Sequence, residues 1–357
     1  AATPTTASLG IFGRSLVLFG ACEGVAVSAD VLLLPVRGFL PDPAARVVSL
    51  ACGRSHMALL DDMGRCWSLG GVGAAASLGA AGCTLQLVDA LLGVRLVKAV
   101  CGDGHTAAMA ANGDVFTWGR VLWESSDGLG SESPIRRDSS RKVVDLAAGD
   151  SHIAAVSLGE AYAWGHNHHG QCARDPGLRT VREPSRAEGA LAAVAARRVA
   201  CGRHHTAVLS SLGGVFTFGA NLCGQLGRDA CQGGWDPAQV HIGEVMRDRE
   251  PCPDVVLIVQ VACGDEHTIC LTDTGRVIAF GSGGHGQLGL GSARGFRRPV
   301  AIRTLTGIGD IAAGGVWSLF RSARGDQVFL AGRTGEREDD NRLLRQVVSM
   351  RGAQAKK

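Results

Sequence analysis

Long hydrophobic runs, tyrosine and an excess of charge of one sign are all scarce in this chain of 357 residues. It contains one tyrosine, and its 36 Lys and Arg residues nearly balance its 33 Asp and Glu residues, which leaves a formal net charge of +3. This balance argues against strong electrostatic steering toward nucleic acid or toward an acidic partner. No apolar run approaches the roughly 20 residues that a membrane-spanning helix requires.

Paired cysteine motifs and catalytic motifs are also missing. The 12 cysteines form no C-x-x-C pair, and several stand in the same apolar context, A-C-G, at 51–53, 200–202 and 262–264. We interpret most of them as buried free thiols of a reducing, intracellular compartment. The sequence has no G-x-S-x-G, no H-E-x-x-H and no Walker-type lysine loop. It therefore predicts no enzyme active site, no cofactor and no metal.

The chain begins AATPTTASLG, without a methionine. Either a targeting segment has been removed or the start of the protein is not included. Import into mitochondria is the location that we expect, and the cytosol and the nucleus are the alternatives.

Glycine is abundant, with 51 residues, and it recurs in a repeat. The repeat is Gly-x-x-His followed, some seventeen residues after its glycine, by an aromatic-glycine pair. Complete copies start at Cys52, Cys101, Ala148, Cys201 and Cys263, and a degenerate copy from Ala313 has Trp317 in place of the histidine. The closing glycines are about 50 residues apart, a period typical of propeller blades; they are Gly70, Gly119, Gly165, Gly219, Gly281 and Gly332.

One further closing glycine, Gly20, lies near the start of the chain. Its unit has the second half of the repeat but lacks the first, and LLRQVVSMRG at 343–352 is similar to that missing half, ARVVSLACG at 45–53. Six complete units and one split between the two ends predict a closed ring of seven. Pairing both ends in one sheet would remove exposed strand edges.

Each unit is predicted to be β structure. DVFTWG and RVIAFG are short runs rich in β-branched and aromatic residues, bounded by turn residues. Four strands in each unit of about 50 residues fit a propeller blade. The sequence therefore predicts an all-β, seven-bladed β-propeller that forms a single domain over 1–357.

The chain resembles the regulator of chromosome condensation family, whose fold is a seven-bladed β-propeller. The motif V-A-C-G-x-x-H-T, continued by W-G-x-N-x-x-G-Q-L-G, is met most fully at 199–227 and 261–289 and in part at 147–171. The stretches GVGAAASLGAAG after Gly70 and RVLWESSDGLGS after Gly119 have lost the Asn and Gln positions. These departures leave the blades intact but weaken any function tied to particular loops.

The glycine loop GSGGHG at 281–286 has the glycine spacing of a dinucleotide-binding loop. That reading requires a helix directly after the glycines, within a βαβ unit. QLGLGSARGFRRP follows instead, with three more glycines and a proline. We therefore interpret this loop as the turn after one blade's inner hairpin.

The recurring histidines have a functional and a structural interpretation. A ring of imidazoles could bind metal, but copies at identical places in successive blades are too symmetrical for a site of three or four ligands. We favour hydrogen bonds to neighbouring strands, with each glycine allowing close backbone approach. The residues predicted to be structural are His56, His105, His152, His205 and His267, with Gly53, Gly102, Gly149, Gly202, Gly264 and Gly314. The cluster His166, His168 and His169 in WGHNHHGQ is likewise assigned to a turn, because Asn167 and Gln171 match the family's turn pattern.

Candidate interaction residues lie in one insertion and in basic clusters. The interval from Gly219 to Gly281 is longer than most, and its excess lies near 228–254, which contains Trp235. The loop is either an interaction anchor or a cover for its own blade. Basic pairs, and a basic tail at about 351–357, either contact RNA or are solvated faces. The predicted interaction residues are Trp235, Asp236, Arg247, Arg249, Arg297 and Arg298.

We expect a non-catalytic protein-interaction scaffold, a subunit of a large protein or ribonucleoprotein assembly such as the mitochondrial ribosome or its maturation machinery. The alternative comes from the resemblance, since the family includes a nucleotide-exchange factor for the GTPase Ran. On that reading the chain is a guanine-nucleotide exchange factor for a small GTPase, and 228–254 is the wedge that would press on it.

Overall fold

A computed structural model describes residues 8–12, 15–19, 32–35, 40–42, 44–70, 85–120, 131–136, 142–229, 234–242, 256–333 and 345–349. Within them the chain forms strands and two short 3-10 helices, η1 (Asp89–Leu91) and η2 (Gly189–Leu191). No helix in these ranges is long and apolar enough to span a membrane.

The described strands form six four-stranded sheets and one three-stranded sheet, each with its strands in chain order. The first strands are β4 (Val47–Cys52), β8 (Leu96–Cys101), β12 (Val143–Ala148), β16 (Ala196–Cys201), β20 (Ile258–Cys263) and β24 (Ile308–Gly314). The second strands are β5 (His56–Asp61), β9 (His105–Ala110), β13 (His152–Ser157), β17 (His205–Ser210), β21 (His267–Thr272) and β25 (Trp317–Ser322).

The outer half of each sheet follows the same order. The third strands are β6 (Cys66–Gly70), β10 (Val115–Gly119), β14 (Glu160–His166), β18 (Val215–Gly219), β22 (Val277–Gly281) and β26 (Gln327–Gly332). The fourth strands are β7 (Gln86–Leu87), β11 (Ser131–Arg136), β15 (Thr180–Arg186), β19 (Gly234–Gln239), β23 (Phe296–Ala301) and β27 (Arg345–Ser349). This blade-by-blade order confirms the predicted all-β propeller fold class.

Two features of the predicted ring are wrong. The described residues contain six complete blades rather than seven, and the seventh sheet has only three strands, β1 (Ser8–Phe12), β2 (Ser15–Phe19) and β3 (Leu32–Pro35). The C-terminal strand β27 does not complete that sheet, because it pairs with β26 as the outer strand of its own blade. The V-V-S pattern identifies a strand but not its partner, and β26 precedes it closely enough that pairing closes only a short loop.

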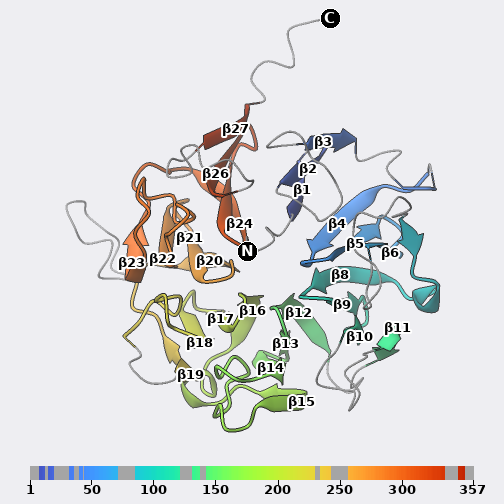
Figure 1. The fold of residues 1–357 in the computed structure, drawn as a ribbon, viewed down its shortest axis with the longest axis horizontal. Helices are drawn as coiled ribbons and strands as arrows, with labels where there is room; N and C mark the ends of the chain where they lie inside the picture. The colour runs from blue at the N-terminus through green and yellow to red at the C-terminus, as the bar shows by residue number, and fades with distance from the viewer. Residues whose placement is uncertain are drawn as a thin grey trace, which may run out of the picture. The chain divides into compact units, whose positions relative to one another are not determined.

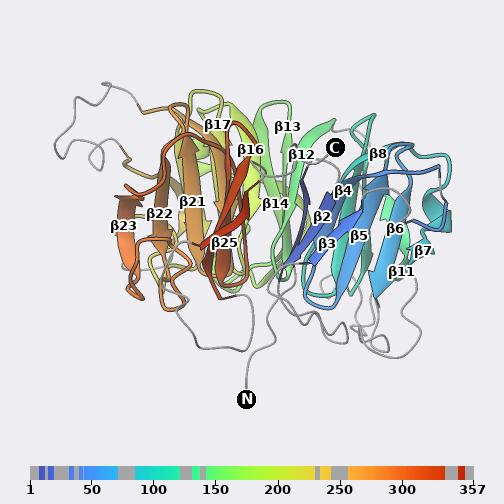
Figure 2. The ribbon, with the colours of Figure 1, turned by 90° about the horizontal axis from the view of Figure 1, so that it is seen from above.

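The chain divides into two compact units. The first contains 1–158, 162–166 and 180–185, and the second contains 159–161, 167–179 and 186–357. In the second unit, the sheets that begin with β16, β20 and β24 follow one another, and these three first strands lie nearest to each other (Figure 1). Seen from the side, β21, β22 and β23 stand one beside the next (Figure 2). The single domain over 1–357 stays a prediction.

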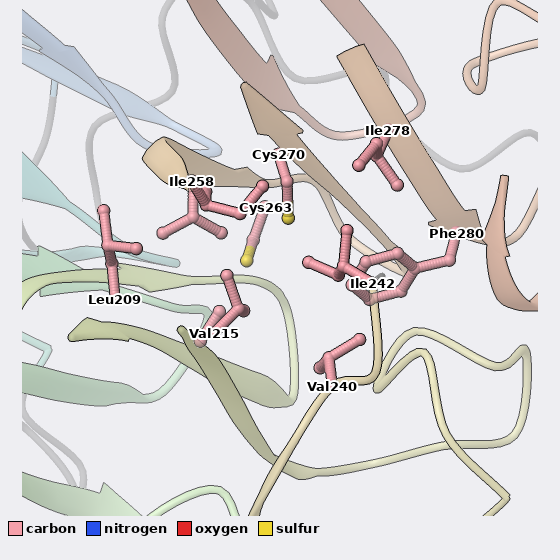
Figure 3. Close-up of a cluster of buried hydrophobic side chains, with 11 residues drawn as sticks. Leu209, Val215, Val240, Ile242, Ile258, Cys263, Cys270, Ile278 and Phe280 are labelled. Atoms are coloured by element: carbon pink, nitrogen blue, oxygen red, sulfur yellow. The ribbon is translucent and has the colours of Figure 1, made fainter. Parts of the chain in front are cut away.

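Second strands carry the core. Every residue of β5, β9, β13, β17 and β21 is buried, because both faces of each strand are covered. Figure 3 shows the result between two neighbouring blades, where Leu209 and Val215 of one blade face Ile258, Cys263 and Cys270 of the next. Continuous apolar runs of strand length are typical of such fully buried strands.

Each first strand of the six complete blades contains a β-bulge near its start. In β4, Val47 pairs with Asp61 and Ser49 pairs with Leu60, so Val48 between them has no partner across the strand pair. The same register shift occurs in the other five first strands. A bulge turns the extra residue out of the regular alternation, and the bulged residue is exposed in all six blades.

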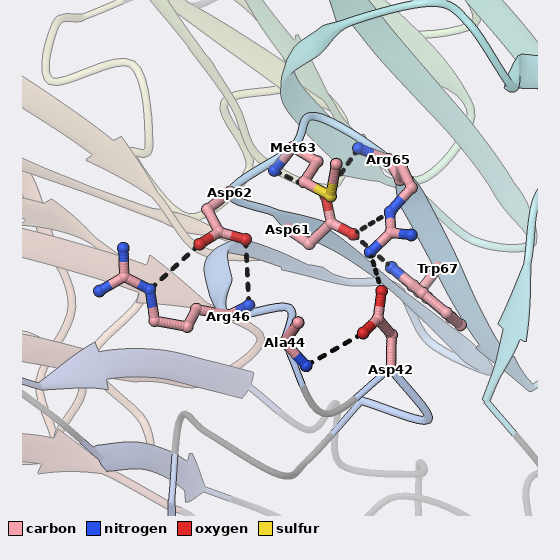
Figure 4. A network of polar contacts seen from close by, with 8 residues as sticks. All are labelled: Asp42, Ala44, Arg46, Asp61, Asp62, Met63, Arg65 and Trp67. Atoms are coloured by element: carbon pink, nitrogen blue, oxygen red, sulfur yellow. Dashed lines mark hydrogen bonds and ion pairs between the residues drawn. The ribbon is translucent and has the colours of Figure 1, made fainter.

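A polar network closes the turn between β5 and β6 (Figure 4). The buried carboxylate of Asp61 accepts hydrogen bonds from Arg65 Nε at 2.6 Å and Trp67 Nε1 at 3.0 Å, and Arg65 also reaches Asp42 at 2.7 Å. Burial opposes the charge on Asp61, but the bonds from Trp67 and Arg65 outweigh it and hold the pKa of that carboxyl below its usual value. The network therefore holds the turn between β5 and β6 through an ionised, hydrogen-bonded Asp61 carboxylate.

The described cysteines are free thiols: Cys52, Cys66, Cys101, Cys172, Cys201, Cys223, Cys263 and Cys270. Burial raises the pKa of Cys66, Cys101 and Cys263 to about 12. These thiols are protonated at neutral pH and pack as small apolar side chains.

Candidate functional site

The histidine of the repeat bonds to the blade that follows it. His56 Nε2 lies 2.8 Å from Thr106 Oγ1, and His205 Nε2 lies 2.9 Å from Thr268 Oγ1. The Thr268 hydroxyl donates its own proton to the carbonyl oxygen of Gln225 at 2.9 Å. The proton shared by His205 and Thr268 therefore comes from Nε2 of the imidazole, which is the donor.

The degenerate sixth copy keeps the hydroxyl that accepts the histidine's hydrogen bond. His267 Nε2 lies 2.9 Å from Ser318 Oγ, which donates to the carbonyl oxygen of Gln287 at 2.7 Å. Trp317 replaces the histidine of this copy and is buried at the start of β25. The blade before the degenerate copy therefore keeps its inter-blade bond.

Burial keeps these imidazoles uncharged. It lowers the pKa of His56 and His267 to about 4 and that of His105 and His205 to about 3. His152 is fully buried as well. In the part of the chain that the structure describes, no three His, Cys, Asp or Glu side chains are grouped as metal ligands. The bonds from Nε2 of His56, His205 and His267 support the structural interpretation of these three positions.

The glycine three residues before each histidine makes room for the imidazole. A Cβ at Gly53 would lie 2.7 Å from His56 Cε1, and a Cβ at Gly264 would overlap the ring of His267. The glycine of the next repeat also approaches: the Gly102 carbonyl oxygen lies against Gly53, and the Gly149 carbonyl oxygen lies against Gly102. Gly314 ends β24 and pairs with Trp317. The Gly-x-x-His spacing thus combines a tight turn with inter-blade packing.

The Asn and Gln positions hold the turns after the closing glycines. Asn167 Nδ2 donates to the carbonyl oxygens of Arg174, Asp175 and Leu178 at 2.9–3.1 Å, and its Oδ1 accepts from Cys172 N at 3.0 Å. Gln171 Oε1 accepts from the N–H of His169. Asn221, Gln225 and Gln287 make the corresponding bonds in later blades. These contacts support the turn interpretation of WGHNHHGQ.

Replacing Asn167 with alanine is expected to lower the free energy of unfolding by about 2 kcal/mol, because buried carbonyl groups lose their donor. Urea denaturation followed by circular dichroism measures the change. Asn112→Ala is the matched control, since the exposed Asn112 side chain bonds only within its own turn, to Asp114. Equal effects of the two substitutions would contradict the role assigned to Asn167.

The predicted interaction residues fall on two neighbouring blades. Trp235 is the second residue of β19 and is 37% exposed, and Arg297 is the second residue of β23. Each packs against the glycine of the preceding blade's turn, Trp235 on Gly170 and Arg297 on Gly224. Arg297 also donates to the Leu222 carbonyl oxygen at 3.1 Å. The predicted anchor is therefore an outer strand laid over a turn, and the segment 228–254 is strand in part.

A chain of polar contacts connects the two outer strands. Arg298 forms an ion pair with Asp229, and Arg228 donates to the carbonyl oxygen of Asp236 at 2.8 Å. Arg247 and Arg249 lie outside the described residues, as do 230–233, 243–255 and the tail 351–357. The structure thus brings Trp235, Asp236, Arg297 and Arg298 to one region of the second unit.

Three other side chains border this region. The rings of His169 and His204 lie 4.9 Å apart, from the turn after β14 and the turn before β17. Leu222, at the tip of the turn after β18, is 82% exposed. Tryptophan and arginine are enriched at protein-interaction surfaces.

Sequence reasoning missed the bulged residues of the first strands. The signal is present, because RVV at 46–48, RLV at 95–97 and KVV at 142–144 share one spacing. Alternation alone does not reveal it, since a bulge interrupts the period of two and no residue type marks the interruption.

Residues 159–209, 213–271 and 274–320 match the family "Regulator of chromosome condensation (RCC1) repeat". A second model of the same repeat matches 196–225 and 258–287. These ranges contain the Gly-x-x-His and Asn-x-x-Gly-Gln positions whose contacts are given above. The chain belongs to the RCC1 repeat family. The family resemblance predicted from the motifs is therefore confirmed.

Curated RCC1 relatives are longer than this chain. It is 34% identical over 228 residues to "RCC1 domain-containing protein RUG3, mitochondrial" of Arabidopsis thaliana, which covers 59% of this chain and 48% of the relative. It is 35% identical over 212 residues to "Probable E3 ubiquitin-protein ligase HERC3" of Homo sapiens, covering 57% of this chain and 19% of the relative. The chain thus matches less than half the length of either relative.

Two solved structures have a similar fold. Prp20p from Saccharomyces cerevisiae is similar with a TM-score of 0.75 and 22% identity, covering 95% of this chain and 87% of that one. Human WBSCR16 has a TM-score of 0.70 and 21% identity, with 84% and 79% covered. The RCC1 propeller is therefore the fold of this chain.

Proposed function

We propose that this RCC1-repeat protein is a non-catalytic interaction platform, a subunit of a larger protein or ribonucleoprotein assembly. The observation that carries the proposal is the use of the repeat's polar side chains. The buried histidines bond the next blade, as His205 does to Thr268, and the Asn and Gln side chains hold turns. The polar side chains that recur in the repeat therefore make structural hydrogen bonds. The outer strands and turns, which differ from blade to blade, are left to bind partners.

A mitochondrial assembly is the setting that we propose. The support is the relative RUG3, whose name places that protein in mitochondria. The free, protonated thiols agree with a reducing compartment. Cytosolic and nuclear locations are the alternatives, and imaging of the full-length protein with a C-terminal tag distinguishes the three. RNA contact through the basic linkers stays a prediction within this proposal.

Trp235 is the residue that we expect to anchor a partner. Its backbone and Cβ pack on Gly170 while the indole is partly exposed. Trp235→Ala keeps the packed Cβ and is expected to weaken assembly at least tenfold, as for a tryptophan hot spot. The measurement is the amount of tagged protein that co-sediments with its native large complex on a sucrose gradient.

Leu212→Ala is the matched control, because Leu212 is 81% exposed on the turn between β17 and β18. This turn lies at the Gln239 end of β19, opposite to the Trp235 end. Equal sedimentation of wild type and Trp235→Ala in the large complex would refute Trp235 as the anchor. Sedimentation of the wild type only as a monomer would refute the platform itself.

Guanine-nucleotide exchange on a small GTPase is the second candidate. The observation that favours it is structural similarity to Prp20p, a protein whose solved structure was studied together with its binding to Gsp1p and histones. The assay is GDP release from purified small GTPases with and without this protein, and then with 228–254 shortened. Acceleration that disappears on shortening would favour exchange over the platform, and no acceleration would favour the platform.

A further inference from the structure

Three successive blades of the first unit expose a valine at the same place. Val48, Val97 and Val144 are the bulged residues of β4, β8 and β12, with no partner across the strand pair. They are 54%, 48% and 62% exposed, whereas the residues before them are buried or partly buried. A bulge that turns three valines toward solvent is the arrangement of a contact surface rather than of a core.

The three valines lie on strands that touch. β8 contacts β4 on one side and β12 on the other, and the strands run side by side in the first unit (Figure 1). Each valine is the second residue of its strand, so all three stand at the same end of their blades. Met63, in the turn between β5 and β6, is 65% exposed at that end, and Leu92, before β8, is 54% exposed.

A cation precedes each valine by two residues. Arg46, Arg95 and Lys142 are all exposed. Arg95 packs on the neighbouring blade's turn at Gly64, and Lys142 packs on the corresponding turn at Gly113. Arg95 and Lys142 are therefore placed beside the turn of the preceding blade, whereas Arg46 contacts Asp62 of its own blade.

The charges on this surface are unbalanced. Asp62 pairs with Arg46, and Asp145 pairs with Lys98 at 2.6 Å. The side chains of Arg95 and Lys142 form no ion pair with any described residue. Apolar side chains flanked by uncompensated cations are complementary to apolar side chains flanked by carboxylates.

The second unit provides an internal comparison. Its bulged residues are Arg197, Val259 and Gly309, and the residues two places before them are Ala195, Leu257 and Gly307. None of these three blades has the cation-x-valine pair. The pattern is therefore a property of the first unit and not of the blade fold.

We propose that the surface formed by Val48, Val97, Val144, Arg46, Arg95 and Lys142, here called the valine-cation surface, binds an acidic amphipathic segment of a partner protein. Apolar residues of the segment cover the valines, and its Asp or Glu residues pair with Arg95 and Lys142, because Arg46 is already paired with Asp62. The inference rests on the proposed platform function but concerns a surface distinct from that of Trp235.

The probe is a random peptide library displayed on phage and selected on the immobilised full chain. The enriched peptides are expected to alternate apolar residues with Asp or Glu. The double variant Val97→Ser with Val144→Ser should weaken their binding at least tenfold by fluorescence anisotropy. Arg95→Glu with Lys142→Glu should do the same, and raised salt should weaken binding to the wild type.

Val259→Ser is the matched control, because Val259 is the exposed bulged residue of β20 and lacks the cation; it should change binding less than twofold. Thermal melting of every variant checks the fold. Peptides that bind the double valine variant as well as wild type, or a selection that yields no valine-dependent peptide, would overturn the proposal. Displacement of the peptides by a single-stranded RNA oligonucleotide, with valine-independent RNA binding, would also overturn it. A failure here leaves the Trp235 sedimentation result untouched, so the two proposals fail separately.

Discussion

Gly202→Ala is expected to lower the free energy of unfolding by about 3 kcal/mol. An ideal Cβ at Gly202 would overlap the imidazole of His205 and would approach the Gly264 carbonyl oxygen at 2.5 Å. Neither neighbour can move easily, since the imidazole is bonded to Thr268 and the carbonyl belongs to the next blade's turn. The added methyl group must therefore push two blades apart, which is the costly kind of overpacking.

Urea denaturation of the substituted and wild-type proteins measures this effect. Gly284→Ala is the matched control, because a Cβ there has no heavy atom within 4 Å and the φ angle is not in the left-handed region. The control should stay within about 0.5 kcal/mol of wild type. Adding His205→Ala to Gly202→Ala should recover part of the loss, since the overlap with the ring disappears. A loss of the same size for both glycines would refute the inter-blade packing.

The repeat itself was the most predictable part of this protein. A histidine begins five of the six second strands, as at His205 and His267, and closing glycines such as Gly219 have the positive φ of 111° that a turn of this kind demands. These positions were readable because one local geometry recurs along the chain. The recurrence of the motif strengthens the assignment of each copy, and the conformation of a tight turn is decided by its own residues rather than by distant ones.

Strand partnership was less predictable. The similarity between 343–352 and 45–53 suggested an inner strand, but 345–349 is an outer strand paired with β26. Side-chain pattern records which residues are covered, and inner and outer strands can share a pattern while their hydrogen-bond partners differ. Pairing is a long-range property that is decided by chain connectivity and by the edges that are available.

The candidate surfaces also differ in how well the sequence predicts them. Trp235 was detectable because an aromatic residue in a long interval is conspicuous, although its place on β19 rather than in a loop was not expected. Val48, Val97 and Val144 were not detected, because a valine in a strand is ordinarily a core residue. Only the register of the strand pairs shows that they are the unpaired residues.

The free energy of unfolding is expected to fall with pH already at pH values well above those at which carboxylates titrate. In the unfolded chain histidine has a pKa near 6.5, whereas burial lowers the pKa of His205 to about 3 and that of His56 and His267 to about 4 in the folded chain. Between these values the unfolded state binds more protons, so the free energy of unfolding falls as the pH falls. Each buried histidine contributes up to about 1.4 kcal/mol per pH unit.

The carboxylates act in the same direction but at lower pH. Hydrogen bonds with Arg65 and the backbone lower the pKa of Asp42, and hydrogen bonds with Arg46 lower that of Asp62, from an ordinary value of 3.8. Their contribution is lost only as the pH falls below that value. Urea denaturation at pH 7.5, 6 and 5 therefore isolates the histidines.

His205→Gln separates the titration from the packing. A glutamine takes up no proton, so the dependence of the unfolding free energy on pH should lose about 1.4 kcal/mol per pH unit below pH 6, whatever the substitution does at pH 7.5. His285→Gln is the control, since His285 is an exposed histidine of the same unit. Burial keeps the imidazole neutral, and its Nε2 donates to Thr268 while that hydroxyl donates to Gln225. A slope unaltered by His205→Gln would mean that His205 takes up its proton without unfolding of the chain, and its burial as a neutral imidazole would then be wrong.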